Sequence, residues 1–171
     1  MQVLFYLSAG VAVLATVLAI TRANAVHALL YLVVSLLAVA VIFFLLGAPF
    51  VAALEVIIYA GAIMVLFVFV VMMLNIGPAS EQQERQWLSA SVWTGPTFLA
   101  AILLLELGYM LAVDGTGLAR GADEVSPEAV GIALFGPYLL AVELASMLLL
   151  AGLVGAYHLG ARRAAGEEAE P

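Results

Sequence analysis

The sequence predicts an all-α membrane protein with five transmembrane helices. The chain has 171 residues, of which 66% are hydrophobic and only 10% are charged. Its mean hydropathy is +1.20, whereas about a quarter of the residues in a soluble domain are charged. The apolar residues also gather in five long runs. We therefore expect a single transmembrane domain over residues 1–160, followed by a short acidic C-terminal tail at 161–171.

Each apolar run is long enough to cross a bilayer as a helix. A spanning helix needs about 20 apolar residues for a ~30 Å hydrocarbon core, and its backbone groups are paired within the helix. The runs lack the period-two alternation of a membrane β-barrel. The spans are predicted at about 2–20, 26–46, 51–74, 92–113 and 131–158.

Helix-breaking segments separate the five spans. They read "TRANA", "GAPF", "IGPASEQQERQ" and "VDGTGLARGADEVSPEA" in chain order. The first span has an alternative interpretation, because "ANA" at 23–25 resembles a signal-peptide cleavage site. No positive charge precedes this run, and it is longer than a usual signal core, so we favour an uncleaved span.

The arginines predict the orientation of the chain. Arg22, Arg85, Arg162 and Arg163 follow the first, third and fifth spans, which places them on one side, and only Arg120 falls on the other side. Because positive charge concentrates in cytoplasmic loops, we expect an outside N-terminus and a cytoplasmic C-terminus. Interfacial aromatic side chains are expected at Trp87, Trp93 and Tyr157.

The composition argues against several kinds of site. Cysteine is absent, which excludes disulfides, thiolate zinc sites and cysteine-held iron–sulfur clusters on this chain. His27 and His158 lie near the ends of different spans and are interpreted as interfacial side chains, not as metal or haem ligands. A net charge of −7 argues against nucleic acid as a partner. We expect no metal site and no independent catalytic site.

Three glutamates lie within predicted spans: Glu55, Glu106 and Glu143. A charged side chain near the middle of a span costs about 2.5–3.5 kcal/mol on insertion scales, so such groups usually face protein or water. Glu55 lies one helical turn before Tyr59, so the two side chains share a face and are placed to share a hydrogen bond or a water. A buried carboxyl can exchange protons near neutral pH, which makes Glu55 a candidate proton relay. The alternative is an acid that only ends the span at its aqueous side.

Glu143 lies deeper in its span than Glu55. Ala141, Ala145 and Gly152 line a small-residue face suited to close helix packing, and Glu143 points nearly opposite, with Ser146 as a possible partner. Pro137 removes a backbone donor one to two turns earlier, which favours a kink that admits water. The alternative is a glutamate hydrogen-bonded for assembly only.

Two further residues within the spans are candidates. Glu106 has only Tyr109 as a polar neighbour on its own helix face and carries a weaker signal. Gly61 locally weakens the third span and offers a place for a one-residue bulge, or alternatively for close helix packing.

The run "ALEVIIYAGAIMVLFVFVVMMLN" at 53–75, with "VHALLYLVVSLLAVAVIFFLLGAPFVAALE" before it and "LFGPYLLAVELASMLLLAGLVGAYHLG" near the end, resembles a known family. That family is subunit J of the proton-pumping NADH-quinone oxidoreductase, respiratory complex I, whose mitochondrial counterpart is NADH dehydrogenase subunit 6. The resemblance covers roughly residues 1–160. One departure is Ala25, where the family often has proline.

The resemblance implies a membrane-arm subunit in the cytoplasmic membrane of a prokaryote, packed beside the small K-type and A-type subunits and near the quinone-site subunit. NADH, FMN, iron–sulfur clusters and quinone are then expected on other subunits, with no cofactor bound by this chain. It also implies a π-bulge at Tyr59, Ala60 and Gly61, whose twisting opens and closes a water path. The family's acid in that helix matches Glu55, and its "VELAS" motif contains Glu143. Glu106 matches no family motif.

We therefore expect a subunit that couples quinone reduction to proton translocation through buried carboxylates and a switchable third helix. The expected proton-path or coupling residues are Glu55, Tyr59, Gly61, Glu143 and Ser146. The alternative is a purely structural scaffold of the same complex, in which the acids only satisfy hydrogen bonds between helices. A free-standing ion transporter is disfavoured by the small number of polar groups in the spans.

Overall fold

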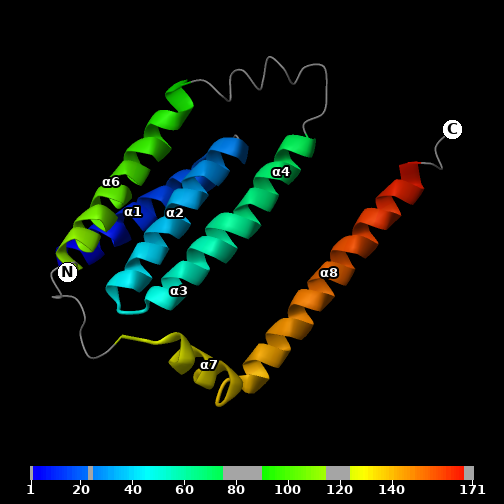
Figure 1. The fold of residues 1–171 in the computed structure, drawn as a ribbon. Coiled ribbons are helices and arrows are strands. Elements are labelled where there is room, and N and C mark those ends of the chain that lie inside the picture. Colours follow the sequence, from blue (N-terminus) through cyan, green and yellow to red (C-terminus); the bar gives the residue numbers. More distant parts are fainter. Residues whose placement is uncertain (1, 23–24, 75–89, 115–123, 168–171) are drawn as a thin grey trace. The chain divides into compact units, whose positions relative to one another are not determined.

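The computed structural model describes residues 2–22, 25–74, 90–114 and 124–167. The chain forms two compact units, Met1–Val125 and Ser126–Pro171, which are considered separately (Figure 1). The regular elements of the described residues are all helices. In the first unit they are α1 (Gln2–Thr21), α2 (Ala25–Leu45), α3 (Pro49–Leu54), η1 (Glu55–Ile63), α4 (Met64–Leu74) and α6 (Ala90–Asp114). The second unit contains α7 (Pro127–Phe135) and α8 (Leu139–Glu167).

Within the described part of the chain, five helical stretches are long and apolar enough to cross a membrane. They are Gln2–Thr21, Ala25–Leu45, Pro49–Val71, Trp93–Ala112 and Leu139–His158. The predicted all-α fold with five transmembrane helices is therefore confirmed. The third stretch is α3, η1 and α4 in continuous succession, and η1 is a π-helix, so the predicted π-helical feature near Tyr59–Gly61 is confirmed too.

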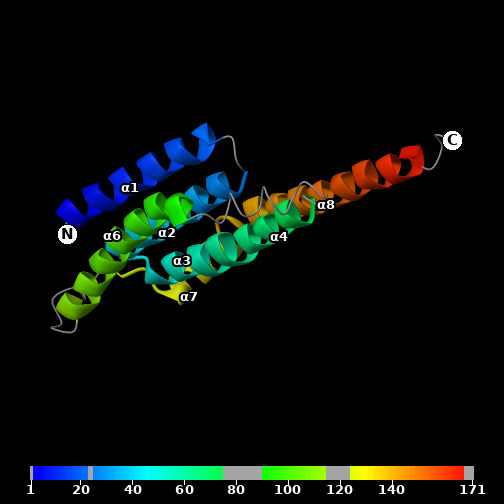
Figure 2. The same ribbon diagram turned by 90° about the horizontal axis from the view of Figure 1, so that it is seen from above.

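Helices α1, α2 and α6 form the three-helix core of the first unit, and Figure 2 shows α2 between α1 and the helix made of α3, η1 and α4. Small residues on α1 and α2, such as Ala12, Ala15 and Ala38, are buried where these helices meet. Side chains of this size let two helices approach closely, as is usual in membrane proteins. The fully packed part of the unit is therefore the side occupied by α1, α2 and α6.

The turn between α2 and α3 follows from the predicted breaker "GAPF". Gly47 has a φ of +78°, a left-handed conformation that favours glycine. The N–H of Ala48 donates to the carbonyl of Phe43 at 3.0 Å, and the N–H of Gly47 donates to that of Phe44 at 3.1 Å, the pairing of a Schellman motif. Pro49 then begins α3 at a position where no backbone donor is needed.

The second unit begins with well-defined helix signals and then breaks. The side chain of Ser126 accepts a hydrogen bond from the N–H of Ala129 at 3.1 Å, and Pro127 follows as the first residue of α7. The apolar stretch predicted at 131–158 is divided between α7 and α8 by residues 136–138. A Cβ atom at Gly136 would lie 2.7 Å from the carbonyl oxygen of Ile132, so the break suits glycine, and Pro137 follows it as the sequence suggested.

Some sequence predictions fall on parts of the chain that the structure does not describe. Arg85, Trp87 and Arg120 lie outside the described residues, as do the side chains of Arg162 and Arg163. Trp93 and Tyr157 are exposed on their helices. The backbone of α8 continues to Glu167, into the predicted C-terminal tail.

Candidate functional site

The centre of the candidate site is the π-helix η1, nine residues long, in the middle of the third span. At its end, the N–H of Met64 bonds to the carbonyl of Tyr59, five residues back, and also to that of Gly61. At its start, the N–H of Glu55 bonds to carbonyls three and four residues back, as in ordinary helices. The hydrogen-bond register therefore changes within this span. Such π-segments are rare and are frequently found at functional sites.

Glu55 is the first residue of η1 and is only partly exposed. Tyr59 lies on the same segment with 51% of its side chain exposed. The two side chains share no hydrogen bond in the structure, and Glu55 makes none with any described residue. Both polar groups thus lie at the outer side of this chain's own fold.

Gly61 lies at a point of η1 where the backbone leaves little room for a side chain. A Cβ atom at this position would lie 3.0 Å from the carbonyl oxygen of Val56, five residues earlier. Since this neighbour is backbone, a larger residue would require the π-segment itself to shift. Of the two interpretations of Gly61, a bulge or close helix packing, the local geometry fits the bulge.

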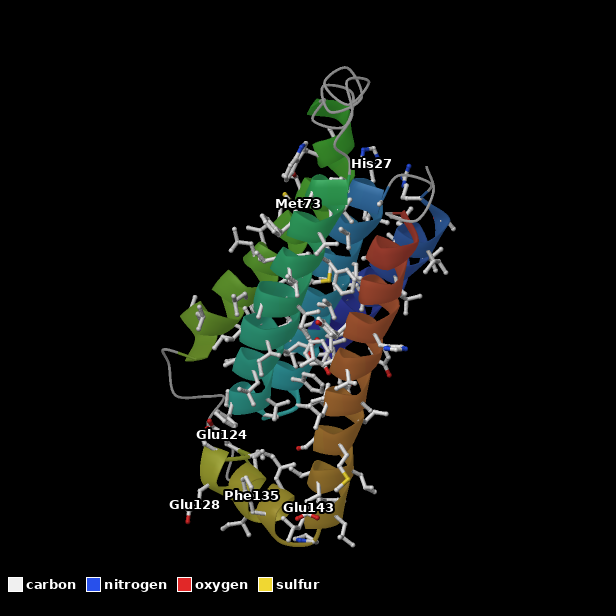
Figure 3. All side chains as sticks on the ribbon, turned by 90° about the vertical axis from the view of Figure 1, so that its right-hand side faces the viewer. His27, Met73, Glu124, Glu128, Phe135 and Glu143 are labelled. Atoms are coloured by element: carbon white, nitrogen blue, oxygen red, sulfur yellow. The ribbon has the colours of Figure 1, made fainter. Side chains whose placement is uncertain are left out.

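Glu143 lies near the start of α8 (Figure 3) and is exposed on the second unit. Ser146 does not serve as its partner, because the Ser146 hydroxyl donates to the carbonyl of Val142 at 2.9 Å. A serine within a helix commonly satisfies its hydroxyl in this way. Glu143 is therefore presented by α8 without a hydrogen bond to the described residues.

Glu106, the acid with the weakest signal in the sequence, is the one that the fold buries. Its side chain is 3% exposed, and Ser8, on α1, is fully buried beside it. The Ser8 hydroxyl donates to Glu106 Oε2 at 2.8 Å. Tyr109, the neighbour expected from the sequence, is 60% exposed. The available signal was the presence of a serine within another apolar span, but the pairing of two residues so distant in the chain required the fold.

A second polar contact lies farther along α1. The hydroxyls of Thr16 and Ser35 are 2.7 Å apart, and Ser35 also donates to the carbonyl of Ala12 at 3.2 Å. At the far end of α1, the guanidinium of Arg22 lies 5.3 Å from the ring centroid of Tyr31. These contacts tie the second half of α1 to α2, while the side chains of η1 make no hydrogen bond to the described residues.

Comparison with known proteins identifies the family. Residues 15–159 match the family described as NADH-ubiquinone/plastoquinone oxidoreductase chain 6. The chain belongs to this family. It is 64% identical over 160 residues to NADH-quinone oxidoreductase subunit J of Pseudomonas aeruginosa, covering 94% of this chain and 96% of that protein. It is 58% identical over 168 residues to the subunit J of Escherichia coli K12, covering 98% and 90%.

A more distant relative is subunit J of Buchnera aphidicola from Schizaphis graminum, 50% identical over 161 residues, which cover 94% of this chain and 98% of that protein. The chain is thus a membrane-arm subunit of NADH-quinone oxidoreductase, complex I, of the J type. The five apolar helices and the bacterial relatives make it a multi-pass protein of a prokaryotic inner membrane. Its partners are other subunits of that complex.

Proposed function

We propose that this chain couples quinone reduction to proton translocation by a change of helical register in η1. In this mechanism Glu55 and Glu143 exchange protons, Tyr59 and Ser146 offer hydroxyls to the path, and Gly61 permits the change. The observation that carries the proposal is the π-helix itself, in the middle of a membrane span and bounded on both sides by α-helix.

The mechanical consequence of a register change supports this role. If η1 returned to α-helical hydrogen bonding, the residues on one side of it would rotate by roughly 100°, one residue's share of a 3.6-residue turn. Glu55 and Tyr59 would then face different neighbours relative to α4. A segment with two hydrogen-bond registers is the kind of two-state element that energy coupling requires.

We propose in addition that the chain has no redox role and no catalytic site of its own. Its lack of cysteine supports this, because iron–sulfur clusters are usually held by cysteine thiolates. NADH, FMN, the clusters and quinone then bind to other subunits. The expected neighbours are the K-type, A-type and quinone-site subunits, and the expected orientation is N-terminus outside and C-terminus cytoplasmic. The exposed apolar side chains along α8, such as Leu148 and Leu149, suit contact with other subunits or lipid.

The proposal is tested by Glu55→Gln in membranes that contain the assembled complex. We expect NADH-driven proton pumping, followed with a pH-sensitive dye, to fall about tenfold, which corresponds to about 1.4 kcal/mol on the proton-transfer barrier. Reduction of an artificial acceptor by NADH, which does not need the membrane arm, should stay at the wild-type rate.

Glu128→Gln is the matched control, because Glu128 is an exposed acid in the first turn of α7 and lies outside the five spans. It should pump as the wild type does. Wild-type pumping in Glu55→Gln would end the proposal for Glu55. A lower yield of complex with unchanged pumping per complex would instead support the scaffold alternative.

A further inference from the structure

The three-helix core holds a carboxyl with one oxygen bonded and the other without a partner. Glu106 Oε2 accepts the hydroxyl proton of Ser8 at 2.8 Å, whereas Oε1 is buried and has no hydrogen-bond partner among the described residues. The whole side chain is 3% exposed. Leu99, Leu103 and Met110 lie on the same face of α6 and are buried with it, so the surroundings are apolar.

No charged side chain of the packed helices faces this carboxyl among the described residues. Helix α1 contains no acidic or basic residue, and its Tyr6 is 73% exposed. On α6 itself, Tyr109 is 60% exposed. Helix α6 ends at a second acid, Asp114, eight residues after Glu106. The other titratable residues on these helices are His27 and Tyr31 of α2.

Both of those residues of α2 lie at the other end of the core. The contact between Thr16 and Ser35 fixes an antiparallel register of α1 and α2, which sets Ser8 opposite about residue 43. His27 is then about 24 Å away along the helix axis at 1.5 Å per residue, and Figure 3 labels it near the start of α2. Among the described residues of these three helices, no cation is thus placed to neutralise Glu106.

A carboxylate held by a single hydroxyl in such surroundings is costly, since a buried charge needs a partner and several hydrogen bonds. A neutral carboxyl fits the observed contacts better. It needs one donor for its carbonyl oxygen, which Ser8 supplies to Oε2, and its own proton then belongs on Oε1. We propose that Glu106 and Ser8 form a further proton-binding site of this chain, in which Oε1 carries a proton that exchanges with water.

The position of the site permits such exchange. Glu106 lies six residues before Ala112, the end of its span, or about 9 Å at 1.5 Å per residue. Figure 1 shows the start of α1 beside the same end of α6. Proton uptake forms the Oε1–H bond as an O–H bond of hydronium breaks and leaves water, and release is the reverse. Because the site lies on α6 and α1 and not on η1, it stands independently of the proposed coupling role.

The test is infrared difference spectroscopy of the intact purified complex, wild type minus Glu106→Gln, in H₂O and in D₂O. We expect a C=O band of a protonated carboxyl that is lost in Glu106→Gln and that shifts to lower frequency in D₂O. Loss of this band together with its isotope shift would establish a protonated and exchangeable group.

Ser8→Ala keeps the acid and removes its donor. The band should remain but move to higher frequency, because the carbonyl oxygen has lost its hydrogen bond. Ser35→Ala removes a buried hydroxyl from the same core and should leave the band in place. If Glu106→Gln does not assemble, the wild type minus Ser8→Ala spectrum decides by itself, since a displaced band appears there as a paired gain and loss.

Three results would overturn the proposal. The first is the absence of a carboxyl C=O band that responds to these substitutions, which would mean that Glu106 is ionised. The second is a responding band that does not shift in D₂O, which would mean a dry and permanently protonated group. The third is an ionised-carboxylate band that changes with added NaCl, which would assign a sodium site in its place.

Discussion

The third span and the three-helix core hold an acid in opposite ways. In η1, Glu55 is partly exposed and has no hydrogen bond to the described residues, and the backbone around it adopts π-helical pairing. In the core, Glu106 is buried between α6 and α1 and bonded to Ser8. The chain therefore fixes one acid with its own residues and leaves the other at its outer side, where other subunits, lipid or water can reach it.

The presence of an acid within a span therefore says little by itself about its role. Both glutamates are ionisable residues within a membrane span, where such residues are rare. Only the packing around them shows that Glu106 is held in place and that Glu55 is free to change its neighbours. Stability should depend mainly on the core, and coupling mainly on η1. Substitutions in each region test this division.

The largest effect is expected for Gly61→Leu. The added side chain begins 3.0 Å from the carbonyl oxygen of Val56 and so biases the register of η1. Proton pumping per complex should fall at least about tenfold, equivalent to about 1.4 kcal/mol, as measured by dye quenching in membranes. Gly108→Leu, at a glycine with open space around it in this chain, is the control. Equal pumping in Gly61→Leu and the wild type would remove the division between the two regions.

Gly95→Val should lower the stability of the core without changing proton pumping, the reverse of what is expected for Gly61→Leu. A Cβ at Gly95 would overlap the phenol of Tyr31, and overpacking of this kind costs about 1–3 kcal/mol. The complex should lose this subunit at a lower temperature on native gels after graded heating, while pumping per intact complex stays unchanged. Reduced pumping with normal heat resistance would show that the core also participates in coupling.

Ser126→Ala tests a helix end that belongs to neither region. The lost N-cap hydrogen bond to Ala129 should destabilise α7 by about 1 kcal/mol. Faster hydrogen exchange is expected at the first backbone amides of α7, measured by mass spectrometry, with α1 and α2 unaffected. Ser126→Asn, which can also cap, should restore slow exchange.

The smallest effect is expected for Ser35→Ala. It removes the contact with Thr16, and interhelical hydrogen bonds in membrane proteins average about 0.6 kcal/mol. The heat resistance of the complex should fall only slightly. A loss as large as that of Gly95→Val would show that this contact holds α1 far more strongly than membrane proteins usually require.

The sequence was sufficient for the five spans, because bilayer thickness and backbone pairing leave few solutions for runs of this length. The "GAPF" turn and the break near Pro137 also followed from local chemistry. The π-helix came from the resemblance and not from the pattern, since an ideal helical wheel assumes 3.6 residues per turn throughout. The expected roles of Glu55, Tyr59, Gly61, Glu143 and Ser146 remain predictions.

The contacts of the acids within the spans were harder to predict for a physical reason. The sequence pattern suggests Tyr109 as the hydrogen-bond partner of Glu106 and Ser146 as that of Glu143, because each lies three residues from its acid. In the fold, the Ser146 hydroxyl bonds to the backbone of its own helix, and Glu106 bonds to Ser8, which lies 98 residues earlier in the chain. Which distant serine meets which acid depends on helix packing, which the periodicity of a single span does not encode.

The carbonyl of Gly47, in the turn after α2, accepts the N–H of Val125 at 2.8 Å. Residue 125 leaves the ribosome only after α3, η1, α4 and α6 have been synthesised, so this bond closes late in biogenesis. The hairpin of α2 and α3 must wait in the membrane with that oxygen unoccupied by its final donor. A truncated nascent chain ending before residue 125 should therefore leave this turn more accessible to protease than the finished subunit does.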